Sequence, residues 1–115
     1  MVFLYINWKL LSDNKVIIDE VNKKVDFQNN ILTYEDKYGV HTVFIDKKIY
    51  ERKSPDNIFR INFFNNTLDV IFDKHNLTYD IVSKFSKNEE EIRLYYSLGD
   101  EEKMIIITKG ESNER

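Results

Sequence analysis

The chain has 115 residues, 42% of them apolar and 32% charged, which is the composition of a folded globular domain rather than a disordered segment. Its 17 lysine and arginine residues face 20 aspartate and glutamate residues, and this net charge of −3 disfavours nucleic-acid binding, which usually needs a basic excess. The absence of cysteine excludes a disulfide framework, thiolate metal sites and cysteine nucleophiles.

The residue usage also bears on fold class and location. Alanine is absent and glycine is scarce, whereas asparagine, lysine and isoleucine are frequent, as an AT-rich genome would encode. Because alanine is the strongest helix former, its absence disfavours a helical fold. No apolar run approaches the ~20 residues that a membrane span needs, and the apolar start has no positively charged segment before it. We therefore expect a cytoplasmic protein without membrane association.

In chain order, runs of alternating apolar and polar residues follow one another, separated by turn residues. In the second run the residues Ile17, Val21, Val25 and Phe27 have the same parity and are expected on one face. The strongest turn is Ser-Pro-Asp-Asn at residues 54–57, where proline presets the backbone angle. The expected strands cover residues 2–10, 15–27, 31–35, 40–46, 49–53, 59–63, 68–73, 77–85, 92–98 and 104–108.

About ten short strands with short connections leave no room for crossover helices, so they must pair antiparallel. So many strands need closure or stacking to protect their edges. The sequence therefore predicts an all-β protein, an antiparallel up-and-down barrel of about 8–10 strands, with a two-sheet sandwich as the alternative. We expect one domain over residues 1–110 and a disordered polar tail over residues 111–115.

Several segments between residues 31 and 108 resemble the YwiB-like family of small bacterial proteins, which has a calycin (lipocalin-like) barrel fold. The segments that carry the resemblance are ILTYED, IYERKSPDN, INFFNNT, FDKHNLTYDIVSKF, IRLYYSL and MIIIT. The family is uncharacterised, so the resemblance implies a calycin barrel in the cytoplasm and no particular activity. Calycin barrels tend to hold a small apolar or amphipathic ligand, and this is the expectation that the fold-level analogy adds.

Signals for catalysis are weak. The two histidines, His41 and His75, lie at a strand start and in a turn, without metal-ligand spacing, and we expect structural or solvated roles for both. The acidic run Glu89-Glu90-Glu91 falls where a hairpin turns and is expected to be solvated. Three scattered glycines cannot form a phosphate-binding loop. We therefore expect no enzyme, no metal and no cofactor.

Arginine and tryptophan give more specific expectations. Arg60 and Arg93 alternate with apolar neighbours and should face solvent. Arg52 faces outward if Ile49 faces inward, but it faces inward if Tyr50 does. An inward arginine in a small barrel needs a carboxylate or an anionic ligand as its partner. Trp8, on the first strand, is expected to close one end of the barrel by packing in the core, as the tryptophan of calycins commonly does.

Two functions remain open from the sequence. The first is a barrel that binds a small apolar or anionic ligand in its interior, with the cavity residues Arg52, Leu68, Val70, Phe72, Tyr79, Ile81, Leu94 and Tyr96. The second is a filled barrel that acts as a protein-interaction module or a homodimer, through a sheet edge or through Tyr5, Phe64 and Tyr95. Inward tyrosines such as Tyr34 need partners for their hydroxyl groups in either case.

Overall fold

The computed structural model describes the backbone of residues 2–110 and the side chains of residues 4–110, so the expected tail over residues 111–115 lies outside the described residues. Between Val2 and Gly110 the chain is all strand and turn, with no helix long and apolar enough to cross a membrane. The strands are β1 (Val2–Ser12), β2 (Lys15–Gln28), β3 (Ile31–Asp36), β4 (Gly39–Phe44), β5 (Ile49–Lys53), β6 (Asn57–Asn62), β7 (Thr67–Phe72), β8 (His75–Asp80), β9 (Val82–Lys87), β10 (Glu91–Leu98) and β11 (Glu101–Lys109).

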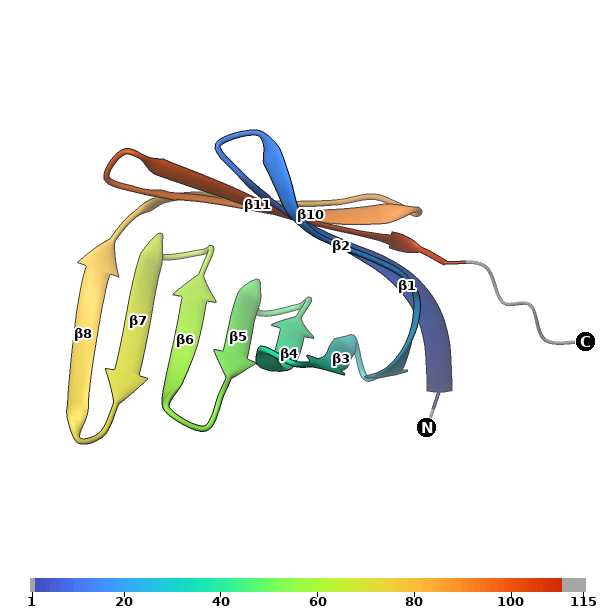
Figure 1. Cartoon of the computed structure of the whole chain (residues 1–115), viewed down its shortest axis with the longest axis horizontal. Helices are drawn as coiled ribbons and strands as arrows, with labels where there is room; N and C mark the ends of the chain where they lie inside the picture. The colour runs from blue at the N-terminus through green and yellow to red at the C-terminus, as the bar shows by residue number, and fades with distance from the viewer. Residues whose placement is uncertain (1, 111–115) are drawn as a thin grey trace, which may run out of the picture.

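All eleven strands belong to one antiparallel sheet with the order β8-β7-β6-β5-β4-β3-β2-β1-β11-β10-β9. Strands that follow one another in the chain are neighbours, and the pairing of β1 with β11 joins the two halves. Strands β3 to β8 form one layer, β9 to β11 lie across it, and the long β1 and β2 curve from one layer to the other (Figure 1). The predicted antiparallel up-and-down barrel is confirmed, with one strand more than the upper end of the expected range.

The barrel is nearly but not fully closed. Its two end strands, β8 and β9, are joined by a single residue, but each pairs with a different neighbour and not with the other. Strand β8 pairs with β7, and β9 pairs with β10, so the two strands are the ends of the sheet. The connecting Ile81 is buried, and its amide donates a hydrogen bond to the Asn66 carbonyl. The sequence predicts one strand over 77–85, because alternation continues through this bend. The structure divides it where Ile81 turns inward.

A bulge in β2 corrects the expected orientation of this strand. The register between β1 and β2 shifts between Ile6 and Trp8, where Asn22 has a φ of 54° and its amide bonds to the Asn7 side chain at 2.9 Å. A second shift lies opposite Leu10. Because the extra residue at the first shift reverses the alternation, Val21 does not face inward with Val25 and Phe27, and Ile17 is itself the extra residue of the second shift. Ile17 and Val21 are 55% and 64% exposed, so the shared face predicted for these four residues is wrong.

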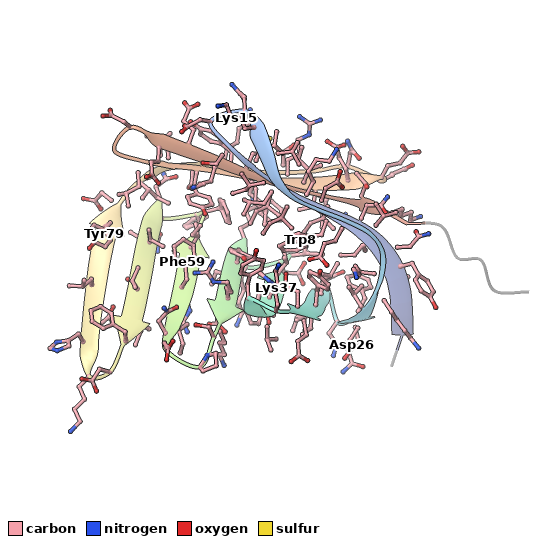
Figure 2. The ribbon with its side chains drawn as sticks, viewed as in Figure 1. Trp8, Lys15, Asp26, Lys37, Phe59 and Tyr79 are labelled. Carbon is pink, nitrogen blue, oxygen red and sulfur yellow. The ribbon has the colours of Figure 1, made fainter. Side chains whose placement is uncertain are left out.

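The core lies between the two layers and is made of inward residues from most strands. Trp8 is its largest fully buried side chain and lies at the centre of the barrel (Figure 2). Burial of an aliphatic core side chain is worth about 1.5–3 kcal/mol, so these residues carry most of the folding free energy. The buried core residues are Ile6, Trp8, Val25, Leu32, Tyr34, Val43, Tyr50, Ile61, Phe63, Leu68, Ile81, Ile92, Leu94, Ile105 and Ile107.

Candidate functional site

A cavity of about 240 Å³ opens between the two layers of the barrel. A water molecule takes about 30 Å³ in the liquid, so this space would hold roughly eight of them. The barrel interior is therefore packed with side chains at the core and contains an open space next to it. The cavity is lined by Leu10, Ile17, Ile18, Tyr38, His41, Tyr50, Arg52, Phe59, Tyr96 and Ile105.

Arg52 faces this cavity. The neighbouring Tyr50 is 3% exposed and points inward, and the alternation of β5 places Arg52 on the same side. The guanidinium carbon lies 5.0 Å from the centre of the Phe59 ring, in the position of a cation–π contact. The Arg52 Nε atom is buried and has no hydrogen-bond partner, and no carboxylate of residues 4–110 forms an ion pair with this arginine. The sequence left this orientation open, and the structure places Arg52 inside.

The other two described arginines show the usual arrangement. Arg60 follows on β6, points outward and binds Glu51 through Nη2 and Oε2 at 2.7 Å. Arg93 on β10 pairs with Glu91 and is likewise exposed, as the alternation predicts. Each of these two guanidinium groups has a carboxylate, whereas Arg52 has an aromatic ring and open space.

A hydrogen-bonded chain of side chains lies beside the cavity. His41 is 4% exposed, and its Nε2 lies 2.9 Å from the Asp36 carboxylate while its Nδ1 lies 2.7 Å from the Tyr50 hydroxyl. Burial lowers the pKa of His41, and the opposing effect of Asp36 is smaller. The neutral ring therefore donates from Nε2 to Asp36 and accepts the Tyr50 hydroxyl at Nδ1. The Tyr34 hydroxyl donates to Glu20 at 2.5 Å.

Trp8 packs beneath these polar groups. Its ring centre lies 4.8 Å from that of His41, 5.2 Å from Tyr34 and 6.2 Å from Tyr50. At 1% exposed, Trp8 supports the cavity wall from the core side. The cation–π partner of Arg52 is Phe59.

Tyr96 completes the polar side of the cavity. Its ring contacts Phe59 at 5.9 Å, and burial raises the pKa of Tyr96 to about 12 although the nearby Arg52 opposes the shift. Burial also raises the pKa of Tyr50. Both phenols are therefore neutral at pH 7, and Arg52 is the only charged group among the cavity-lining residues.

The residues that the sequence suggested for ligand binding are divided by the structure. Arg52 and Tyr96 lie together in the cavity wall. Phe72 and Tyr79, 40% and 39% exposed, lie toward the open end of the sheet, where Tyr79 is seen on β8 (Figure 2). The other suggested residues belong to the packed core or lie against it: Leu68, Val70, Ile81 and Leu94.

Of the cavity-lining residues, the sequence reasoning named only Arg52 and Tyr96, and it missed the three that surround the arginine: His41, Tyr50 and Phe59. The signal for His41 was present: the tight turn at Gly39 places it opposite Tyr34, a residue expected to face inward. His41 also pairs directly with Arg52 on β5, so the two side chains lie on the same face of the sheet. Cross-strand register, rather than composition, identifies this group.

The remaining sequence candidates lie outside the cavity. His75 begins β8 and its ring contacts Phe72 at 5.6 Å, while the Asn88 side chain caps the amides of Glu90 and Glu91 in the β9–β10 turn. Phe64 is 78% exposed in the β6–β7 turn, whereas Tyr5 and Tyr95 are half-buried. No three histidine, aspartate or glutamate side chains of the described part of the chain gather as metal ligands.

Comparisons of the chain with models of protein families, with curated proteins and with solved structures find no match. The chemistry of the cavity is therefore the basis on which a function can be argued.

Proposed function

We propose that the barrel binds a small amphipathic anion, with its charged head on Arg52 and its apolar part inside the cavity. The observation that carries the proposal is an arginine that points into a cavity without a carboxylate partner. Half-buried cations of this kind are costly unless an opposite charge or hydrogen-bond acceptors satisfy them. A guanidinium offers five donors in a planar fork, which suits a carboxylate or a phosphate group.

The surrounding groups favour an anion over a cation or a neutral ligand. The phenols of Tyr50 and Tyr96 are neutral, and the His41 carboxylate partner, Asp36, is turned toward the imidazole ring. The Tyr96 hydroxyl has no hydrogen bond to another residue within the described chain, so it is available to a ligand head group.

An apolar part of the cavity wall adjoins these polar groups. Leu10, Ile18, Ile105 and the Phe59 ring form it, and they would contact a short hydrocarbon chain or a small ring. Drug-sized ligands occupy pockets of about 300–1,000 Å³, so a cavity of about 240 Å³ suits a smaller molecule. A short-chain carboxylate has the size and the polarity that this space requires.

The proposal includes the relation to the YwiB-like family and the cytoplasmic location that the sequence suggests. Support for that relation comes from the antiparallel barrel and from the position of Arg52 in the segment IYERKSPDN. Binding of a small ligand inside such a barrel is also what the calycin analogy leads us to expect.

Calorimetric titration with hexanoate, and with hexan-1-ol as the uncharged equivalent, tests this function. We expect hexanoate to bind and hexan-1-ol to bind at least tenfold more weakly, because a charge-assisted hydrogen bond is worth about 1.5–3 kcal/mol. Arg52→Gln should lower the affinity for hexanoate at least tenfold. Arg60→Gln is the matched control, since Arg60 lies on the outer face, and it should leave the affinity unchanged.

Two results would contradict the proposal. One is equal affinity for hexanoate and hexan-1-ol, which would assign the cavity to neutral apolar ligands. The other is equal loss of hexanoate binding in the Arg52 and Arg60 variants, which would place the anion on the outer surface.

A further inference from the structure

Strand β8 is an unprotected edge of the sheet. It ends the sheet beyond β7, and all six of its residues are exposed. Within the described residues, no strand lies beyond it in the plane of the sheet (Figure 1). Its inward residues Leu77 and Tyr79 are 43% and 39% exposed, because no strand packs beside them on that side.

The pairing of β8 with β7 determines which of its backbone groups are free. The Ile81 amide bonds to the Asn66 carbonyl, and residues alternate between bonded and non-bonded positions along an antiparallel pair. The odd-numbered residues of β8 therefore bond to β7. The amide and carbonyl groups of Asn76, Thr78 and Asp80 point to the free edge.

The two edges of the sheet differ in their protection. Strand β9, at the opposite end, carries Lys84 and Lys87, and charged edge residues of this kind prevent pairing with another chain. Strand β8 has neither lysine nor proline. An exposed edge with apolar residues and free backbone groups is a template for strand addition.

We propose that β8 pairs antiparallel with β8 of a second copy of this chain, with Thr78 on the two-fold axis. In this register Thr78 lies opposite itself, and Asn76 lies opposite Asp80 of the second copy. All three residues have their amide and carbonyl groups at the edge, so the pairing forms about six backbone hydrogen bonds. A shift of two residues toward the β7–β8 turn would leave Asp80 without its partner.

Side chains agree with the same register. Leu77 lies opposite Tyr79 of the second copy on the inner face, in the closer non-bonded type of pair, where the two exposed apolar side chains can contact each other. On the outer face the Asn76 amide can donate to the Asp80 carboxylate. This complementarity of β8 to itself is what selects a second copy as the partner. Because the contact is confined to one edge, we expect a weak dimer that forms as the concentration rises.

Single-cysteine variants test the register, because the chain contains no cysteine of its own. Bonded antiparallel pairs have their Cα atoms about 5.5 Å apart, within the range that a disulfide spans. Thr78→Cys should therefore form a disulfide-linked dimer on mild oxidation. Asn76→Cys and Asp80→Cys should not do so separately, because equivalent atoms would be about 13 Å apart along the strand. An equimolar mixture of these two variants should form the mixed dimer.

Sedimentation equilibrium tests association without cross-linking. The unmodified chain should shift from monomer to dimer with concentration, and Leu77→Lys should weaken the dimer at least tenfold by placing a charge on the edge. Val21→Lys is the control, since Val21 is exposed on β2 away from this edge. Circular dichroism establishes that both variants are folded. A chain that stays monomeric at millimolar concentration would overturn the proposal, as would cross-linking of Asn76→Cys to itself without cross-linking of Thr78→Cys.

Discussion

His41 organises the polar wall of the cavity because both of its ring nitrogens are engaged. One nitrogen donates to Asp36, and the other accepts from Tyr50, whose ring is stacked on the imidazole at 6.0 Å. This arrangement holds Tyr50 in one orientation, on the side of β5 that also carries Arg52. The wall beside the arginine is therefore a buried network that a single residue connects.

The folded protein should lose stability in acid because of His41. Burial lowers the pKa of His41 below the value of about 6.5 in the unfolded chain, so the unfolded chain binds more protons as the pH falls below about 6.5. The stabilisation is fully present above that pH and is lost below it. Urea unfolding at pH 7.5 and 5.0 measures the effect. The loss of unfolding free energy between these two pH values should be smaller in His41→Asn than in the unmodified chain. It should be unchanged in His75→Asn, since His75 is exposed. Greater stability at pH 5.0 would contradict this account.

The hydrogen bond from Tyr50 to His41 should contribute measurably to stability. Tyr50→Phe removes the donor and leaves a buried imidazole nitrogen without a partner, at a cost of about 1–3 kcal/mol in the free energy of unfolding. Tyr79→Phe, on the exposed strand β8, should change the free energy by less than about 0.5 kcal/mol. Chemical denaturation of the two variants compares them, and equal losses would refute a role for the buried bond.

At the scale of strands and turns, the hairpin between β3 and β4 brings His41 opposite Tyr34. Gly39 begins β4 with a φ of 134°, and a Cβ atom there would lie 2.2 Å from the Lys53 carbonyl oxygen. Only glycine combines this backbone angle with such a close approach of β5. The turn therefore fixes the register on which the cavity wall depends.

Gly39→Ala should consequently destabilise the protein by about 2 kcal/mol or more. Gly99→Ala provides the comparison: its φ is 62°, but a Cβ atom would meet nothing within 4 Å, so the cost should be about 1 kcal/mol from backbone strain alone. Thermal unfolding of both variants separates the steric effect from the conformational one. A smaller loss for Gly39→Ala than for Gly99→Ala would show that β5 can move away.

Most strands were predictable from the sequence because alternation is a local property, and Pro55 and Gly39 mark turns. The bulge at Asn22 could not be predicted. Asparagine is frequent throughout this chain, so the asparagine that adopts a positive φ cannot be distinguished from the others in the sequence. The division at Ile81 was also hidden, because inward parity continues across it. The cavity could be predicted only in part. Arg52 was a candidate with two possible orientations, and the burial of Tyr50 decides between them.

At the scale of the whole molecule, two connections between the layers create both the cavity and the free edge. The curved β1 and β2 join the layers on one side, and the bend at Ile81 joins them on the other without pairing β8 to β9 (Figure 1). The core around Trp8 fills the middle of the barrel. The space beside it remains open around one unpaired arginine, while β8 remains available for strand addition.

The most direct test of the proposed anion site follows the side-chain Nε–Hε resonances of the arginines by NMR during titration with hexanoate. The chain has four arginines, and of the three in the described part only Arg52 lacks a carboxylate partner. We predict that the Arg52 resonance shifts in a saturable manner and becomes protected from exchange, while those of Arg60 and Arg93 stay unchanged. An Arg52 resonance that does not move at saturating hexanoate, or shifts that are equal for all the arginines, would contradict the account.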